Sequence, residues 1–235
     1  MFKMSRTTKL LYWLVTLASL AGAVLMLVFY TPVEATMGPI QKIFYLHLPA
    51  AIHTLLACTV VFVGSVGFLW QRRRGWDDLA SAAATVSVGL GAVVLVTGMV
   101  WAHSAWGVWW TWSPRLTFTL MLWLLYLVYV LIRPSIESAD RRALVSAVYG
   151  VVAFLDVPLV YLTAWLMPQD IHPTSIQMTG PMQLTLAVWF IPVSLISWGL
   201  IAARYQAGRK GRTRETSERC EPSGKRAAET GEALR

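Results

Sequence analysis

The chain has 235 residues, of which 56% are hydrophobic and only 14% are charged. Soluble domains are about half apolar and about a quarter charged, so this composition excludes a soluble globular protein and indicates an integral membrane protein. The formal net charge is +8, but no other feature supports nucleic-acid binding. The sequence has no phosphate-binding glycine loop, HExxH zinc signature or GxSxG nucleophile motif, and Cys58 and Cys220 form no CxxC pair.

Six apolar stretches are long enough, or nearly so, to cross a hydrocarbon core that needs about 20 residues. Each is expected to be a helix, because a chain in lipid must satisfy its backbone hydrogen bonds internally and the polar alternation of barrel strands is absent. The expected spans are 10–30, 46–70, 79–102, 117–132, 143–164 and 183–203. The predicted fold class is therefore an all-α transmembrane bundle of six helices, formed by one domain over residues 1–203.

The two ends of the chain have different characters. The first span resembles a signal peptide, with basic residues before it and Ala21-Gly22-Ala23 within it, but its apolar residues continue through Tyr30. That length favours an uncleaved anchor. Residues 204–235 are polar and basic and have too little apolar surface to offset the entropy of ordering, which predicts a disordered cytoplasmic tail.

The basic residues predict the orientation of the bundle. All but two of the 20 Lys and Arg residues lie at the ends of the chain or in the connections after the second and fourth spans. The exceptions, Lys42 and Arg115, lie in the alternate loops. Because Lys and Arg are retained on the cytoplasmic side, both termini are expected inside and the segment around Arg115 outside.

A tryptophan-rich segment, "WGVWWTWSPRLT" at residues 106–117, occupies the second outward loop. Trp at a membrane interface is common as part of an aromatic belt, and this interpretation stays open. Belt residues spread around a bundle, however, whereas Trp106, Trp109, Trp110 and Trp112 share one short connector. They are therefore candidates for an apolar, polarizable shelf, followed by the cation Arg115.

Two histidines lie in the outward loops on either side of this segment in the sequence. His47 belongs to "KIFYLHLPAA" at residues 42–51, and His172 to "WLMPQDIHPTSIQMTGPM" at residues 165–182. A single loop histidine is most simply a solvated side chain. Two of them beside four indoles suggest haem, because imidazole is a common axial ligand of its iron and the planar fork of Arg115 suits a propionate.

Three further polar residues have less defined roles. His53 lies six residues after His47, about 240° around the helix, where a helix-to-helix hydrogen bond is the better interpretation. His103 lies beside the tryptophan segment and is a candidate spare ligand or propionate contact. Asp156 is costly in an apolar span; it either bonds a neighbouring helix near the Pro158 kink or has a functional role.

The three outward segments, in this order, resemble motifs of the CcmC/CcmF/CcsA family of haem-handling proteins of cytochrome c biogenesis, most closely its CcmC branch. "WGVWWTWSPRLT" is similar to the signature WGxWWxWDxRLT, with Ser113 in place of the acidic residue, which puts that carboxylate's role in doubt here. The resemblance covers roughly residues 8–203. "WAHSAWG", at residues 101–107, is more similar to the longer CcsA synthetases.

The resemblance implies that His47 and His172 are axial ligands of a transiently bound haem b, contacted by the tryptophan segment, in a multi-pass protein of the bacterial inner membrane. It also implies transfer of the haem to the chaperone CcmE, together with CcmA, CcmB and a small CcmD-like subunit of an ABC-type complex. The chain would then be a transfer component and not an enzyme, with the ATPase activity in a partner. The alternatives are a CcsA-like synthase component, a haem b electron-transfer protein and a permease for another solute.

The orientation can be tested with reporter fusions. Fusions at residues 107 and 175 should report an outside location, and fusions at 75 and 138 an inside location, because the Lys and Arg bias sets the topology of proteins with short loops. Alkaline phosphatase and green fluorescent protein activities would measure this. A reversed pattern would move the tryptophan segment to the cytoplasmic side.

Overall fold

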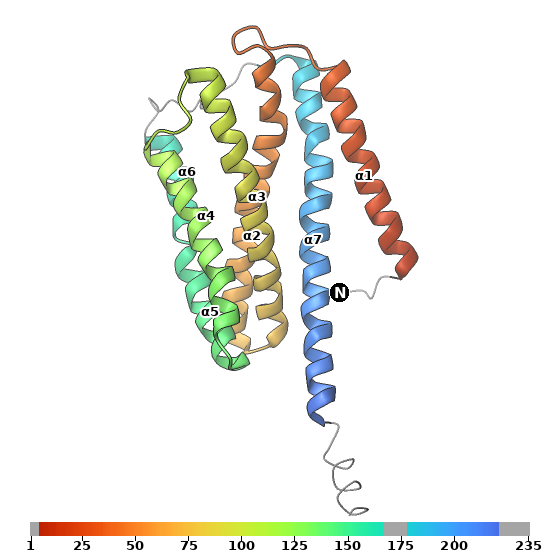
Figure 1. The fold of residues 1–235 in the computed structure, drawn as a ribbon, viewed down its shortest axis with the longest axis vertical. Coiled ribbons are helices and arrows are strands. Elements are labelled where there is room, and N and C mark those ends of the chain that lie inside the picture. Colours follow the sequence, from red (N-terminus) through yellow and green to blue (C-terminus); the bar gives the residue numbers. More distant parts are fainter. Residues whose placement is uncertain (1–4, 167–177, 221–235) are drawn as a thin grey trace, which may run out of the picture.

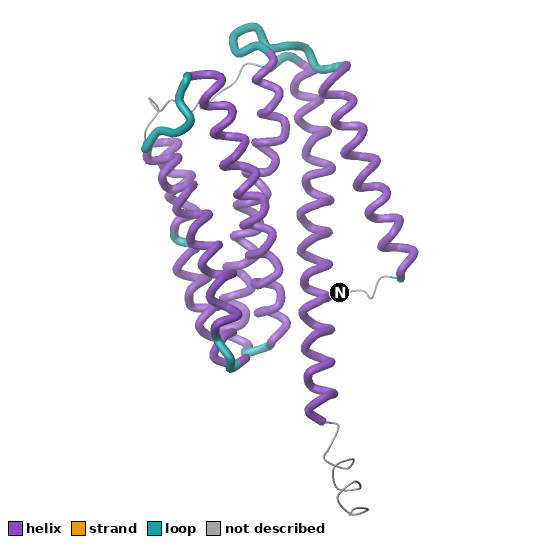
Figure 2. The backbone as a smooth tube through the Cα atoms, viewed as in Figure 1, coloured by secondary structure: helices purple, strands orange, loops and turns teal. Residues whose placement is uncertain are grey.

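The computed structural model describes residues 5–166 and 178–220, and its described side chains are those of residues 5–163 and 178–213. Apart from an isolated bridge between Glu34 and Gly38, these ranges contain helices and loops and no β-structure (Figure 2). In chain order the elements are α1 (Arg6–Phe29), η1 (Pro39–Ile43), α2 (Phe44–Gln71), α3 (Arg74–Trp106), α4 (Pro114–Ile132), η2 (Arg133–Ser135), α5 (Ala139–Ala153), α6 (Asp156–Leu166) and α7 (Gly180–Cys220).

Within the described residues, six helical segments are long and apolar enough to cross a membrane, which confirms the predicted fold class. Five of these segments contain one long helix each. The remaining segment, the fifth in chain order, combines α5 and α6. Figure 1 shows α2 and α3 at the centre, α4, α5 and α6 on one side of them, and α7 with α1 on the other. We call the end of the bundle with residues 107–113 the tryptophan end, and the opposite end, with residues 72–74 and 133–142, the arginine end.

The core of the bundle is the contact between α2 and α3, which small residues make close. Ala57, Ala80, Ala83 and Ala84 are almost completely buried there. A Cβ atom added to Gly64 would lie 3.0 Å from the Cβ of Ala80, so a larger residue would push the helices apart. Small residues at helix interfaces are typical of membrane proteins, in which packing rather than the hydrophobic effect holds the helices together.

The fifth span is broken between α5 and α6 because Pro158 has no amide hydrogen to give to the carbonyl of Phe154. That carbonyl accepts from the Val157 N–H instead, at 3.0 Å, and the Leu155 N–H donates to Val152 O at 3.1 Å. The break changes the neighbours of the chain: α5 packs against α2 and also against α3 and α4, whereas α6 packs mainly against α4. The two halves of one span therefore share α4 but differ in their contact with α2.

The last helix, α7, continues to Cys220, beyond the expected boundary at residue 203. Residues 204–220 were expected to be disordered but are helical in the structure; residues 221–235 of the expected tail lie outside the described residues. A reason for the difference lies in the bidentate ion pair between Arg212 of α7 and Asp78 of α3, which ties the extension to the bundle. This anchor depends on a residue far away in the sequence.

A second bidentate ion pair joins α3 to the end of α4. Arg133 Nη1 and Nη2 donate to the two carboxylate oxygens of Asp77 at 2.7 Å and 2.9 Å, and both side chains are largely buried. The guanidinium also lies 5.7 Å from the ring centre of Tyr129. The charges compensate each other only as long as both are present.

Removing one member of this pair should destabilise the protein strongly. Asp77→Ala leaves the Arg133 guanidinium largely buried without its counter-ion, which in such pairs costs about 3–5 kcal/mol. The double variant Asp77→Leu/Arg133→Met leaves no unpaired charge and should lose much less. Thermal unfolding in detergent would measure both, with Asp140→Ala as the control, because the Asp140 partner of Arg74 is exposed. Equal losses in Asp77→Ala and Asp140→Ala would contradict the prediction.

Candidate functional site

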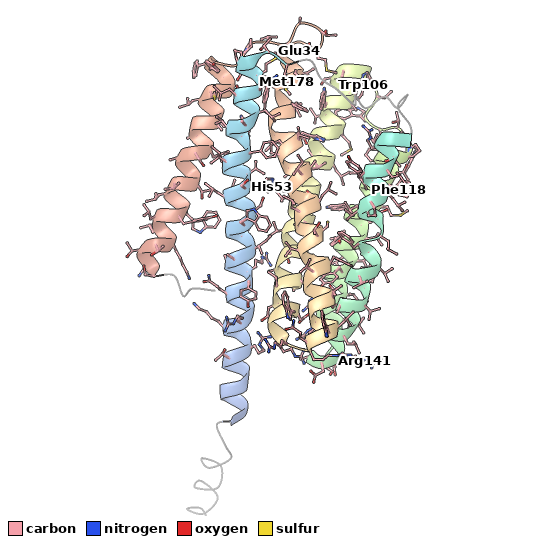
Figure 3. The ribbon with its side chains drawn as sticks, turned by 180° about the vertical axis from the view of Figure 1, so that it is seen from behind. Glu34, His53, Trp106, Phe118, Arg141 and Met178 are labelled. Carbon is pink, nitrogen blue, oxygen red and sulfur yellow. The ribbon has the colours of Figure 1, made fainter. Side chains whose placement is uncertain are left out.

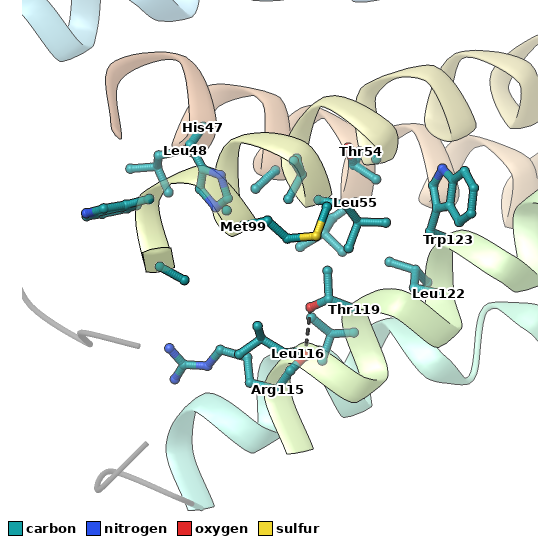
Figure 4. A pocket seen from close by; sticks show the side chains of 18 of the residues that line it. His47, Leu48, Thr54, Leu55, Met99, Arg115, Leu116, Thr119, Leu122 and Trp123 are labelled. Atoms are coloured by element: carbon teal, nitrogen blue, oxygen red, sulfur yellow. Dashed lines mark hydrogen bonds between the residues drawn. The ribbon is translucent and has the colours of Figure 1, made fainter. Parts of the chain in front are cut away.

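A cavity of about 450 Å³ extends from the tryptophan end into the bundle between α2, α3, α4 and α6. Figure 4 shows side chains of its walls, with His47 of α2 and Arg115 of α4 on opposite sides. The space exists because α6 follows α4 and not α2 beyond the break at Pro158. Most of the lining is apolar, including Leu48, Met99 and Leu116, so a ligand here would be largely removed from water.

The cavity also opens sideways, toward the membrane. Ile52 of α2 and Tyr161 of α6 both line it, yet their side chains are 37% and 67% exposed. A second opening lies at the tryptophan end, where the lining residues Trp106 and Val108 are exposed. A ligand in this cavity would therefore be accessible both from the bilayer and from the end of the bundle.

His47 is held in the wall by Thr97 of α3, with 2.8 Å between its Nδ1 and the Thr97 hydroxyl. When the Thr97 hydroxyl gives its proton to the carbonyl of Val93, at 2.7 Å, the hydroxyl accepts from His47. Neutral His47 then carries its proton on Nδ1 and its lone pair on Nε2. This tautomer suits metal ligation through Nε2, and ligating histidines typically donate their other N–H to such an acceptor.

Two neighbours on α3 fix the position of the His47 ring. The Trp101 indole is 97% buried and meets it edge-on, with 6.0 Å between the ring centres. A Cβ atom added to Gly98 would lie 3.3 Å from His47 Cε1, so a larger residue there would press on the imidazole. Thr97 and Trp101 were not predicted from the sequence; their i, i+4 spacing on one helix face was the available signal.

Arg115 lies in the first turn of α4, which begins at Pro114. Its side chain lines the cavity, and its carbonyl accepts a hydrogen bond from the Thr119 hydroxyl at 2.8 Å, the dashed line in Figure 4. The N-terminus of a helix carries partial positive charge, which adds to the charge of the guanidinium. This side of the cavity therefore favours an anionic group such as a carboxylate.

The four loop tryptophans do not form one common shelf. Trp106 and Trp110 line the cavity, whereas Trp109 and Trp112 do not and are 57% and 75% exposed. The reason is the turn that ends α3: Gly107 adopts a left-handed conformation with φ of 74°, and the chain reverses direction there. Trp112 still meets Trp110 edge-on, at 6.0 Å between ring centres.

Trp110 also contributes an unusual polar atom to the cavity wall. Its indole Nε1 is buried and has no hydrogen-bond partner within the described residues. A buried donor left unpaired costs free energy, about 1–3 kcal/mol, which an acceptor on a bound ligand would recover. The indole N–H and Arg115 thus both favour a ligand with acidic oxygens.

His53, His103 and Asp156 do not line this cavity. His53 is buried between α2 and α7, where its Nδ1 donates to Pro49 O at 2.8 Å and its Nε2 lies 2.9 Å from the Ser194 hydroxyl (Figure 3), as expected for helix-to-helix bonding. His103 is exposed and meets Trp109 edge-on, at 4.0 Å between ring centres. Asp156 is 5% exposed, and neither carboxylate oxygen has a hydrogen-bond partner among the described residues. His172 lies outside the described residues.

Comparison with known proteins decides the family. The family model described as "Heme exporter protein C" matches residues 1–218. The chain belongs to the CcmC family. It is 33% identical over 174 residues to the heme exporter protein C of Rhodobacter capsulatus, covering 73% of this chain and 72% of that protein, and 31% identical over 171 residues to that of Paracoccus denitrificans, covering 73% and 71%. It is also 27% identical over 160 residues to a putative cytochrome c biosynthesis ccmC-like mitochondrial protein of Marchantia polymorpha, covering 68% of each.

Membership of the CcmC family confirms the resemblance carried by the three motifs and, with six membrane-crossing segments, makes this a multi-pass inner-membrane protein. The cavity fits haem in its chemistry. The apolar walls suit the ring, and Arg115 and the Trp110 N–H suit its carboxylates.

The Thr97 hydroxyl should matter for ligation by His47. Thr97→Val removes the acceptor of the Nδ1 proton and should weaken haem binding by about 10–100-fold, the usual effect of losing such a partner. Thr97→Ser should restore binding. Titration followed by the Soret band would measure this, with Thr119→Val as a control that removes another hydroxyl lining the cavity. Wild-type affinity in Thr97→Val, combined with loss of binding in His47→Ala, would show that the hydrogen bond is unimportant.

Proposed function

We propose that this CcmC-family protein binds haem in the cavity at the tryptophan end and passes it on during cytochrome c maturation. The observation that carries the proposal is His47, held by Thr97 in the tautomer that ligates metals, in an apolar wall opposite Arg115. The names of the relatives, "Heme exporter protein C" and a cytochrome c biosynthesis protein, support the same role. This is a role in transfer and does not require the chain to catalyse a reaction.

In this proposal haem b is bound transiently between His47 and His172 as its two axial ligands. Trp106 and Trp110 cover the ring, and Arg115 binds a propionate. The residues of the chain bind and orient the haem, while the iron supplies the coordination bonds. The second axial position rests on the sequence motif around His172 alone.

The location and partners complete the proposal. Both termini lie in the cytoplasm and the cavity faces the periplasm, where the chaperone CcmE receives the haem. CcmA and CcmB, with a small CcmD-like subunit, form the ABC-type complex that provides ATP hydrolysis. The orientation is supported by the basic residues that gather at the arginine end, because Lys and Arg are retained on the cytoplasmic side. Figure 3 labels Arg141 at this end of the bundle and Trp106 at the other.

A haem b electron-transfer protein is the main alternative, and His53 counts against it. Such proteins usually bind haem through paired histidines within the membrane, and both ring nitrogens of His53 are engaged with Pro49 and Ser194. The CcsA-like alternative is less well supported, because the family model that matches residues 1–218 is that of heme exporter protein C.

The ligand assignment is tested by single substitutions. His47→Ala and His172→Ala should each lower the haem content of the purified protein and shift the Soret band, because each removes one axial ligand. His103→Ala serves as the matched control, since His103 is exposed and does not line the cavity. Wild-type haem content and spectrum in both single variants would disprove the assignment.

The division of the tryptophans gives a second test. Trp110→Ala should weaken haem binding by on the order of 1 kcal/mol or more, because the indole loses its apolar contact with the ring. Trp109→Ala should change haem affinity much less, because Trp109 does not line the cavity. Affinities per molecule of inserted protein would separate the two effects. Equal losses in the two variants would favour one common shelf.

A further inference from the structure

A second cavity, of about 880 Å³, lies at the arginine end of the bundle, far from the haem site. It is formed by α3, α7, the end of α4 and the start of α5. We call it the arginine-end cavity. Its charged lining residues are Arg74, Arg133, Arg142, Arg204 and Arg212, with Asp77, Asp78, Glu137 and Asp140.

Three of the acids in this lining are already neutralised by three of the arginines. Asp77 pairs with Arg133, Asp78 with Arg212, and Asp140 with Arg74. These pairs connect α3 to the end of α4, to α7 and to α5. They hold the walls of the cavity together and leave the other charged side chains to determine its preference for ligands.

Two arginines of the lining remain, one on α5 and one on α7. Arg142 of α5 donates to the carbonyl of Ile136 at 3.3 Å, which leaves its charge uncompensated. Arg204 of α7 has no hydrogen-bond or ion-pair partner among the side chains that the structure describes. In the lining, only the exposed Glu137 opposes them, so the arginine-end cavity keeps a net positive charge.

The position and shape of the arginine-end cavity suit a lipid headgroup. Arg204 follows directly after the apolar run of α7, and Trp70, 85% exposed, lies in the last turn of α2 at the same end of the bundle. This level is therefore where hydrocarbon gives way to headgroups. The lining residues Ala82, Ala207, Gly208 and Gly211 are small. They leave room for a bulky group between the arginines.

We propose that the arginine-end cavity binds the phosphate group of an anionic phospholipid, with Arg204 and Arg142 as the cations that contact it. Guanidinium groups bind phosphate oxygens with two parallel hydrogen bonds, and basic pockets between transmembrane helices bind anionic headgroups in this way. The site is independent of haem. The bound phospholipid comes from the surrounding leaflet. It connects α5 to α7, which lie on the two sides of the central helices α2 and α3.

The test uses the full chain, purified in detergent and stripped of lipid. Phosphatidylglycerol, phosphatidylcholine or inorganic phosphate is added, and bound lipid is measured by native mass spectrometry together with the midpoint of thermal unfolding. We expect wild type to bind phosphatidylglycerol several-fold more than phosphatidylcholine and to be stabilised by it. Arg204→Gln and Arg142→Gln should each lose this preference. Arg209→Gln is the matched control, because Arg209 lies on the same helix, is exposed and does not line the cavity.

The outcomes separate the sources of the phosphate group. Stabilisation of wild type, but not of Arg204→Gln, by inorganic phosphate alone would support the phosphate site and assign it to a free anion. Equal binding of the two lipids by wild type, with no effect of inorganic phosphate, would overturn the proposal. A preference that survives in both Arg204→Gln and Arg142→Gln would overturn it as well. None of these measurements involves haem. They would therefore keep their meaning if the haem proposal failed.

Discussion

The cavity at the tryptophan end depends on one missing hydrogen bond. Pro158 cannot donate to the carbonyl of Phe154, and the helix breaks there in the middle of a membrane span. In lipid such a break is tolerated only when neighbouring groups satisfy the backbone, and the Val157 N–H does so locally. The consequence is spatial: α5 packs against α2, whereas α6 packs mainly against α4, and the cavity lies between α6, α4 and the central helices α2 and α3. A continuous helix would keep both halves of the span against the same neighbour.

The two histidines of α2 show how neighbouring helices decide a residue's role. His53 faces α7, and the carbonyl of Pro49 and the Ser194 hydroxyl engage both its nitrogens, so it acts as a structural bond. His47 faces α3, where the Thr97 hydroxyl lies 2.8 Å from its Nδ1 and Trp101 meets the ring edge-on. The chemistry of the two side chains is the same, but His53 connects two helices whereas His47 lines the cavity. The positions six residues apart place them on different faces of one helix.

The sequence predicted the spans well because a membrane helix must be apolar along its whole length, a local property. It also separated His47 from His53, since helical periodicity alone does this. It failed where the outcome depends on contacts between distant residues. The helical extension of α7 is anchored by Asp78, more than a hundred positions away from Arg212, and Thr97 becomes important only after α2 and α3 are packed. The division of the tryptophans follows from the backbone at Gly107, which the spacing of the indoles does not reveal.

The openings of the cavity favour transfer over storage. A protein that keeps its haem permanently surrounds the ring, since every exposed edge is a route for loss. Here the wall ends at Ile52 and Tyr161 on the membrane side and at Trp106 and Val108 at the end of the bundle, and all four side chains are exposed. In the proposed complex, a ring bound between them would keep an accessible edge, while His47 and Arg115 on opposite walls would hold its centre and its acidic side. Affinity would then come from a few directed contacts that a partner protein could replace one at a time, as the proposed release to a chaperone requires.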